Sequence, residues 1–370
     1  MRRLMLMIVV ALAITPWIGL AQPQAINESP MQAFVLQSSA TAQVRRAGWT
    51  EFTHLSLGAG LQAGDLLDPK DDPIVVICAD LSKQIVTSIS PVPCPKDRTI
   101  ITQNQMALAG WQRGSVPDPT IPYLISPRKT LVTSATPLIL WNPVDQADSY
   151  QVTVLGEGLE WSTLLESADS HSLIYPQDAP PLQADVPYTV EIVALEQGAP
   201  LSSSADEDAP DTSFHIIAAE KLTQIQPLLD KVHTQITSKS IANLIDAQVY
   251  IQNGLYADAL EVLLNTQASA DTSSDFLASP IPQLILGNIY AGTGVQLEAE
   301  GAYDNALTLA QNGSDLESKA LALTGLARLT SDSDQRGKFA AQAVEAWDEL
   351  GATAQADATA SEFNAPQTGG

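Results

Sequence analysis

Residues that could carry out catalysis are few and scattered along the sequence. Four histidines occur, His54, His171, His215 and His233, and none lies in a motif with a serine, cysteine or carboxylate partner. The sequence also has no phosphate-binding loop, dinucleotide glycine fingerprint or His-Glu zinc helix. Because catalysis needs such groups at defined spacings, the sequence predicts no catalytic residue, metal site or cofactor, and favours a protein that is not an enzyme.

The two cysteines, Cys78 and Cys94, lie close together in the first third of the chain. In an oxidising compartment such a pair closes into a disulfide, which stabilises a chain of this kind by roughly 3 kcal/mol. Two free thiols or a metal site are the alternatives. A metal site would lack ligands, because His54 is the only histidine nearby. We therefore expect a disulfide.

A cluster of carboxylates follows Gly64 and consists of Asp65, Asp68, Asp71 and Asp72. Carboxylate oxygens could bind Ca²⁺. The spacing lacks the alternation and the closing glutamate of a calcium loop, and prolines interrupt it. A solvated turn is the favoured interpretation, with calcium binding as the alternative.

The first residues of the chain have the pattern of a secretory signal. Arg2 and Arg3 precede an apolar run over residues 4–14, and a small-x-small exit ends at Ala21. We expect residues 1–21 to be a signal peptide cleaved after Ala21, which predicts a periplasmic or secreted protein. An uncleaved anchor is the alternative, although the apolar run is short for one. No later segment is long and apolar enough to predict a membrane span.

The charge is strongly negative and unevenly distributed. The net charge is −24, and residues 130–220 contain no lysine or arginine but fifteen acidic residues. An acidic surface repels phosphate backbones, so nucleic-acid binding is excluded. The acidic residues provide solubility, and they could also attract basic partners or diffuse calcium.

The first predicted module is a small β domain at residues 41–112. Strand-like segments at 42–46, 74–78 and 84–88 are separated by glycine-rich turns. The turn at Gly64-Asp65 and the apolar strand that follows resemble the FecR-type β domain, a family of envelope regulators. The resemblance implies a β module of the cell envelope.

A Pro-rich linker at residues 113–130 precedes a second predicted β module at residues 120–217. Alternating apolar and polar residues over 149–154 and 188–194 indicate a two-layer β-sandwich. Trp141 before an Asn-Pro turn and the late strand at 188–194 resemble a fibronectin type III or other immunoglobulin-like domain.

The aromatic residues of this second module have two interpretations. We assign Trp141, Tyr150 and Tyr188 to the core and its corners, since aromatic residues at strand spacing usually pack inside. The alternative is a carbohydrate-binding platform formed by Trp141, Trp161 and Tyr175.

From residue 218 to 351 the apolar period becomes helical, and a pattern of small and aromatic residues repeats. It resembles the tetratricopeptide (TPR) family, although the units are spaced by roughly 40 residues and the usual period is about 34. The signature residues are Ala247, Tyr250, Gly254, Ala259, Leu263, Gly287, Tyr290, Gly294, Ala299, Tyr303 and Ala306. Small residues let helix axes approach, and the tyrosines fill the remaining space. A third, weaker unit begins near Leu321. A plain helical bundle is the alternative.

In such a stack the first helix of each unit lines a concave groove, and we expect this groove to hold the partner. The expected groove residues are Ile241, Leu244, Gln248, Ile251, Gln252, Ile281, Leu284, Asn288 and Ala291. The final residues, 352–370, contain little apolar surface and are expected to be disordered.

The predicted fold class is multidomain, with two all-β modules followed by an all-α TPR-like repeat stack. We expect a non-catalytic extracytoplasmic scaffold or adaptor that binds a protein or peptide in the cell envelope through its helices. The alternatives are a cell-surface or polysaccharide-binding module acting through the β domains, and a FecR-like envelope regulator. The sequence indicates no oligomeric state.

Overall fold

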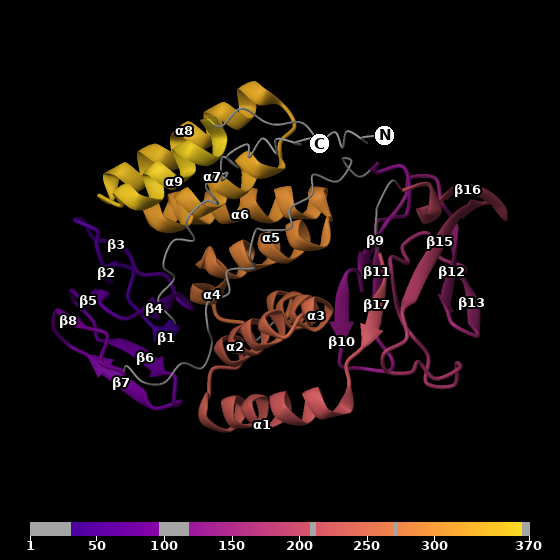
Figure 1. The fold of residues 1–370 in the computed structure, drawn as a ribbon, viewed down its shortest axis with the longest axis horizontal. Helices are drawn as coiled ribbons and strands as arrows, with labels where there is room; N and C mark the ends of the chain where they lie inside the picture. Colours follow the sequence, from indigo (N-terminus) through magenta and orange to yellow (C-terminus); the bar gives the residue numbers. More distant parts are fainter. Residues whose placement is uncertain (1–30, 96–117, 208–211, 270–271, 365–370) are drawn as a thin grey trace, which may run out of the picture.

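The computed structural model describes residues 31–95, 118–207, 212–269 and 272–364, and it contains two β modules with a helical stack between them (Figure 1). The predicted order of β modules followed by helices is confirmed. The predicted signal peptide, residues 1–21, and residues 96–117, which include the start of the Pro-rich linker, lie outside the described ranges. No helix within these ranges is long and apolar enough to cross a membrane.

The first module consists of two small sheets with strand orders β4-β1-β6-β7 and β3-β2-β5-β8. Their strands are β1 (Met31–Gln37), β2 (Gln43–Arg45), β3 (Thr53–His54), β4 (Gly60–Gln62), β5 (Leu66–Asp68), β6 (Ile74–Cys78), β7 (Lys83–Val86) and β8 (Ser90–Pro91). Cys78 and Cys94 form the expected disulfide, with their Cα atoms 5.4 Å apart. The bond ties the end of β6 to the segment after β8.

Strand β1 lies before residue 41, where this module was expected to begin. It pairs with β4 and β6 in the middle of its sheet. Ala33 and Val35 pack into the module's own core, while Met31 and Phe34 join the core of the helices. A strand that is buried on both faces has no polar alternation, which is why its sequence gives no clear strand signal.

The second module is the expected β-sandwich. One sheet has the order β10-β17-β15-β12-β13 with β16 also paired to β15, and the other has the order β14-β11-β9. The strands are β9 (Leu124–Ser126), β10 (Thr130–Val132), β11 (Leu138–Trp141), β12 (Ser149–Gly156), β13 (Leu159–Leu165), β14 (Ser172–Ile174), β15 (Tyr188–Glu196), β16 (Ala199–Ser203) and β17 (Phe214–Ile216).

The aromatic residues of the sandwich pack inside it. Trp141 and Tyr150 are fully buried, with ring centroids 5.6 Å apart. Tyr175 is 1% exposed and packs edge-on against Trp161 at 4.9 Å. The hydroxyl of Tyr188 accepts a hydrogen bond from the backbone N–H of Gln183 at 2.7 Å. Because Trp141 and Tyr175 are enclosed, these rings do not form a platform on which a sugar could stack.

The helices pack in pairs that follow each other in sequence: α2 on α3, α5 on α6 and α7 on α8. Within the described residues the helices are α1 (Ala219–Gln235), α2 (Lys239–Gln252), α3 (Tyr256–Ala268), α4 (Ser274–Ala278), α5 (Ile281–Thr293), α6 (Gln296–Gly313), α7 (Leu316–Leu329), α8 (Ser333–Glu349) and α9 (Thr353–Asn364). Gly294 ends α5 at a φ of +85°, a left-handed conformation that favours glycine.

The ring of Tyr303 on α6 is clamped between two glycines on neighbouring helices. A Cβ atom added to Gly287 on α5 would lie 2.7 Å from this ring, and one added to Gly325 on α7 would lie 2.6 Å from it. The Tyr303 hydroxyl donates to Oδ1 of Asn288 at 2.7 Å. The absence of side chains on the two glycines therefore lets α5 and α7 close on α6.

The expectation that residues 352–370 are disordered is wrong for most of that segment. Residues 353–364 form α9, which packs on α8. Ala356 is buried in a small cluster with Trp347 of α8 and Trp49 of the first module. An alanine-rich segment carries little apolar surface, but its high helix propensity and these neighbours suffice to order it.

Gly287→Ala should destabilise the protein by about 1–3 kcal/mol, because the added methyl group overlaps the Tyr303 ring. Gly301→Ala is the matched control, since Gly301 lies in α6 with nothing within 4 Å of its added Cβ. That change should stabilise the helix by about 1 kcal/mol. Urea denaturation of both variants measures the difference, and equal effects would contradict the clamped packing of Tyr303.

Candidate functional site

The expected groove faces the first β module, which lies against helices α2, α5 and α7 (Figure 1). A Cβ atom added to Gly58 would lie 2.3 Å from Cδ2 of Leu244, so backbone of the module meets α2 directly. The hydroxyl of Ser279 donates to the carbonyl of Leu57 at 2.8 Å. The module thus covers part of the surface that the sequence assigned to a partner.

A cavity of about 160 Å³ remains between the module and the helices. This volume can enclose one or two amino-acid side chains, since a cavity of roughly 150 Å³ accommodates a benzene ring. Five of the expected groove residues line it: Gln248, Ile251, Ile281, Leu284 and Asn288. The other four, Ile241, Leu244, Gln252 and Ala291, are not in its lining. The wall contributed by α2 and α5 is apolar with two amide side chains.

The opposite wall carries an ion-pair network centred on Arg46. Its guanidinium donates to both carboxylate oxygens of Glu317 on α7, at 3.0 and 2.9 Å, and to Asp65 at 2.7 Å. The arginine side chain is 15% exposed and Asp65 is 1% exposed. Burial raises the pKa of Glu317, and attraction to Arg46 offsets only part of this rise. Burial lowers the pKa of Arg46, but the two carboxylates outweigh it and raise the pKa overall.

The start of α7 is held by the same module. Asp315 caps the helix by accepting from the N–H of Ser318 at 3.0 Å, and it also accepts from the hydroxyl of Ser56 at 2.6 Å. The hydroxyl of Thr53 accepts from the N–H of Leu316 at 3.0 Å. Two β-module hydroxyls therefore satisfy polar groups at this helix N-terminus.

Sequence reasoning did not place Arg46, His54, Ser56, Asp315 or Glu317 in this site, although all five line the cavity. A signal existed for the residues on α7, because an aspartate before an apolar helical period marks an N-cap. No local signal existed for the residues of the β module, since their role depends on where that module docks.

Three of the four aspartates considered as calcium ligands have other partners. Asp65 binds Arg46, Asp68 pairs with Lys70 at 2.6 Å, and Asp71 accepts from Thr41 at 3.1 Å. Among the described residues, no three His, Cys, Asp or Glu side chains come together as metal ligands.

The β-sandwich is fixed to the other side of the stack by bonds to helix ends. The hydroxyl of Thr130 accepts from the N–H of Tyr256 at 2.8 Å, at the start of α3. The guanidinium of Arg128, which is 4% exposed, donates to the last carbonyl of α5, that of Thr293, at 3.0 Å, and also binds Glu207 at 2.8 Å. A cation at a helix C-terminus is favoured by the helix dipole.

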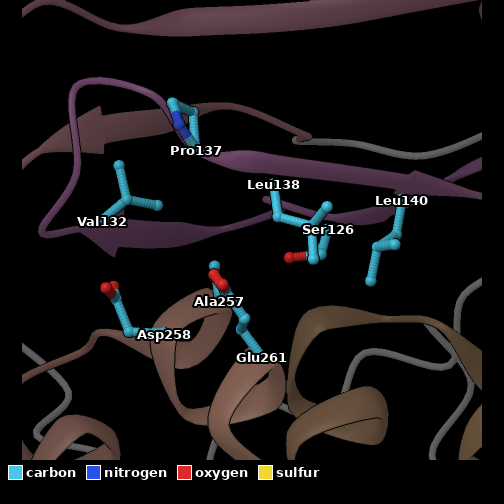
Figure 2. Close-up of a pocket in the computed structure, with 8 residues that line it drawn as sticks. All are labelled: Ser126, Val132, Pro137, Leu138, Leu140, Ala257, Asp258 and Glu261. Carbon is cyan, nitrogen blue, oxygen red and sulfur yellow. The ribbon is translucent and has the colours of Figure 1, made fainter. Parts of the chain in front are cut away.

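A narrow crevice lies at this junction, where Ala257, Asp258 and Glu261 of α3 face the β-sandwich across from Val132, Pro137 and Leu138 (Figure 2). Its volume is about 10 Å³, which holds roughly one water molecule. The Asp258 carboxylate accepts from the backbone N–H and hydroxyl of Thr133. Burial raises the pKa of Asp258 to about 6. The crevice is a packed junction, so the larger cavity beneath the first module is the candidate site.

Comparisons with known proteins give the chain no family. No family model and no curated protein matches the sequence. Among solved structures, the chain is similar to the FN1–FN3 domains of chicken CNTN1, with 8% identity, a TM-score of 0.20 and coverage of 51% of this chain and 57% of that one. It is also similar to a beta-1,2-glucanase from Parabacteroides distasonis, with 12% identity, a TM-score of 0.24 and coverage of 87% and 50%. The chain thus spans about half the length of each.

Arg46→Ala should reduce the free energy of unfolding by about 3 kcal/mol, because it leaves the buried Asp65 carboxylate and the part-buried Glu317 carboxylate without their cation. Arg328→Ala is the control, since its ion pair with Glu362 joins two partly exposed side chains. The control should cost at most about 1 kcal/mol. Chemical denaturation tests both variants, and a loss for Arg46→Ala no larger than the control's would contradict the role of the network.

The raised pKa of Asp258 predicts a pH-dependent stability. Its folded pKa of about 6 lies above the ordinary value of 3.8, so the folded state binds the proton more tightly. This residue's contribution to stability should therefore fall as pH rises from about 4 to 6. Asp258→Asn, which keeps an acceptor for Thr133, should be more stable than the wild type at pH 7 but not at pH 3.5. Urea midpoints across this range test it, and a difference independent of pH would refute it.

Proposed function

We propose that this protein is a non-catalytic scaffold that binds a protein or peptide partner at the inner face of its helices. The observation that carries the proposal is the cavity of about 160 Å³ between α2, α5 and α7 and the first β module. Its apolar wall of Ile251, Ile281 and Leu284 suits a buried side chain of a partner. Gln248 and Asn288 offer amides that can pair with the partner's backbone.

Three further features of the chain support a scaffold function: its helix packing, its disulfide and its net charge. The paired helices, the Tyr303 clamp and the repeated small residues support a TPR-like stack, whose inner face is where such scaffolds bind. The disulfide between Cys78 and Cys94 supports the expected extracytoplasmic location. The net charge of −24 favours a partner that is neutral or basic at the contact.

The cavity also sets how a partner must bind. Because the first module covers part of the inner face, a long helix cannot lie along the full set of expected groove residues. The partner instead inserts one or two side chains at the rim, near Leu321, which is 39% exposed. We therefore expect a short linear segment to be recognised there.

The test uses the chain from residue 22 onward, immobilised and exposed to an envelope extract of the source cells. The Gln248→Trp variant should no longer retain the proteins that the wild type retains, because its indole fills the cavity. Leu277→Trp is the matched control, because Leu277 is 47% exposed on α4 and does not line the cavity. Circular dichroism checks that both variants fold.

The possible outcomes distinguish a wrong binding site from a wrong function. Retention of the same proteins by Gln248→Trp would remove the cavity from the proposal. If the wild type retains no protein at all, the scaffold function itself is wrong.

A further inference from the structure

A second surface of the protein is an open sheet edge at β13. This strand ends the order β10-β17-β15-β12-β13, and in the described residues it pairs only with β12. The pairing runs without a register shift from Tyr150 opposite Leu165 to Gly156 opposite Leu159. The strand lies on the side of the sandwich away from the helices, at the right of Figure 1. An edge strand presents alternate backbone N–H and C=O groups outward.

Apart from the single charge of Glu160, the usual protections of a sheet edge are absent from β13. Proteins blunt exposed edges with lysine, proline, bulges or a covering element, and this strand contains no lysine or proline and no bulge. It instead exposes Leu164, which is 51% accessible. The opposite edge of the same sheet is covered, because the N–H of Leu131 in β10 donates to the carbonyl of Gly254 at 2.9 Å. The edge at β10 is thus closed by the helices, and the edge at β13 is left able to pair.

The charge around β13 selects what can pair with it. Glu157 precedes the strand, Glu160 lies on it and Glu166 follows it, and all three are exposed. Residues 130–220 supply no lysine or arginine to balance them. A second copy of this sandwich would bring together two copies of the segment 130–220, each with fifteen acidic residues and no lysine or arginine, so self-pairing is opposed by charge.

We propose that the β13 edge binds an extended basic segment of a partner protein by strand addition. Backbone hydrogen bonds to the open edge would give affinity, as in other cases in which a peptide extends a sheet. Because side chains alternate along a strand, one row of lysine or arginine can face Glu160 and Glu166, which lie on the outward side of β13 together with Leu164. Glu157 lies in the turn before the strand and adds to the negative charge there. The alkyl stem of one of these basic side chains covers Leu164. This surface is separate from the cavity, so the inference stands without the proposed scaffold function.

The test measures binding of a fluorescent peptide of about nine residues, alternating lysine and valine, to the chain from residue 22 onward. The matched control peptide has the same sequence with N-methyl groups on alternate residues, which keeps its charge but removes the donors that pair with a strand. Anisotropy titrations at about 0.15 M salt should show at least roughly tenfold weaker binding of the methylated peptide. Equal binding would show diffuse charge attraction and overturn the proposal.

Two variants locate the binding surface. Leu164→Lys places a charge on the outer face of β13 and should weaken binding of the peptide by about tenfold. Leu201→Lys adds the same charge to β16, where Leu201 is 40% exposed, and should leave the affinity within about twofold. Unchanged thermal unfolding confirms that both variants fold. Equal losses in the two variants would overturn the proposal. So would a dimer of the wild-type chain that Leu164→Lys dissociates, because a second copy would then occupy the edge.

Discussion

The arrangement of this protein depends on how the ends of its helices find hydrogen-bond partners. A helix leaves backbone groups unpaired at both ends, and here the β modules supply several of the missing partners. Thr130 of the sandwich caps α3, Arg128 binds the last carbonyl of α5, and Thr53 of the first module binds the start of α7. These bonds are directional, so they fix the orientation of each module, while the shared apolar core provides the attraction.

The shape of the inner face of the helical stack is also set by the way the first module docks on it. With the first module bound to the N-terminus of α7 and to Leu244 of α2, the concave surface is divided into a covered part and a cavity. The inner face of the stack is therefore not an open groove that could accept a whole helix. The ion pairs of Arg46 close one side of the cavity and keep the module in place.

Features with a local pattern could be predicted from the sequence. The alternation in β12 and β15 and the small residues around Tyr303 each carry their own signal, because one face of each element is buried and the other is not. The burial of β1 and the ordered helix α9 could not be predicted from the sequence. β1 is buried on both sides, and α9 is ordered by Trp49, which is distant in sequence. The same reason explains why only one wall of the cavity could be predicted. Helical spacing identified Gln248 and Asn288, but nothing in the sequence near Arg46 indicates that it contacts Glu317.

The separation of 271 residues between Arg46 and Glu317 also has a consequence for the order of folding. The first module is synthesised long before α7, and contacts between distant segments form slowly because the intervening chain must first be closed into a loop. Until the helices emerge, Met31 and Phe34 on the outer face of β1 are exposed to solvent and open to non-specific association. The newly made chain therefore exposes an apolar surface until the helices that share this core have been made.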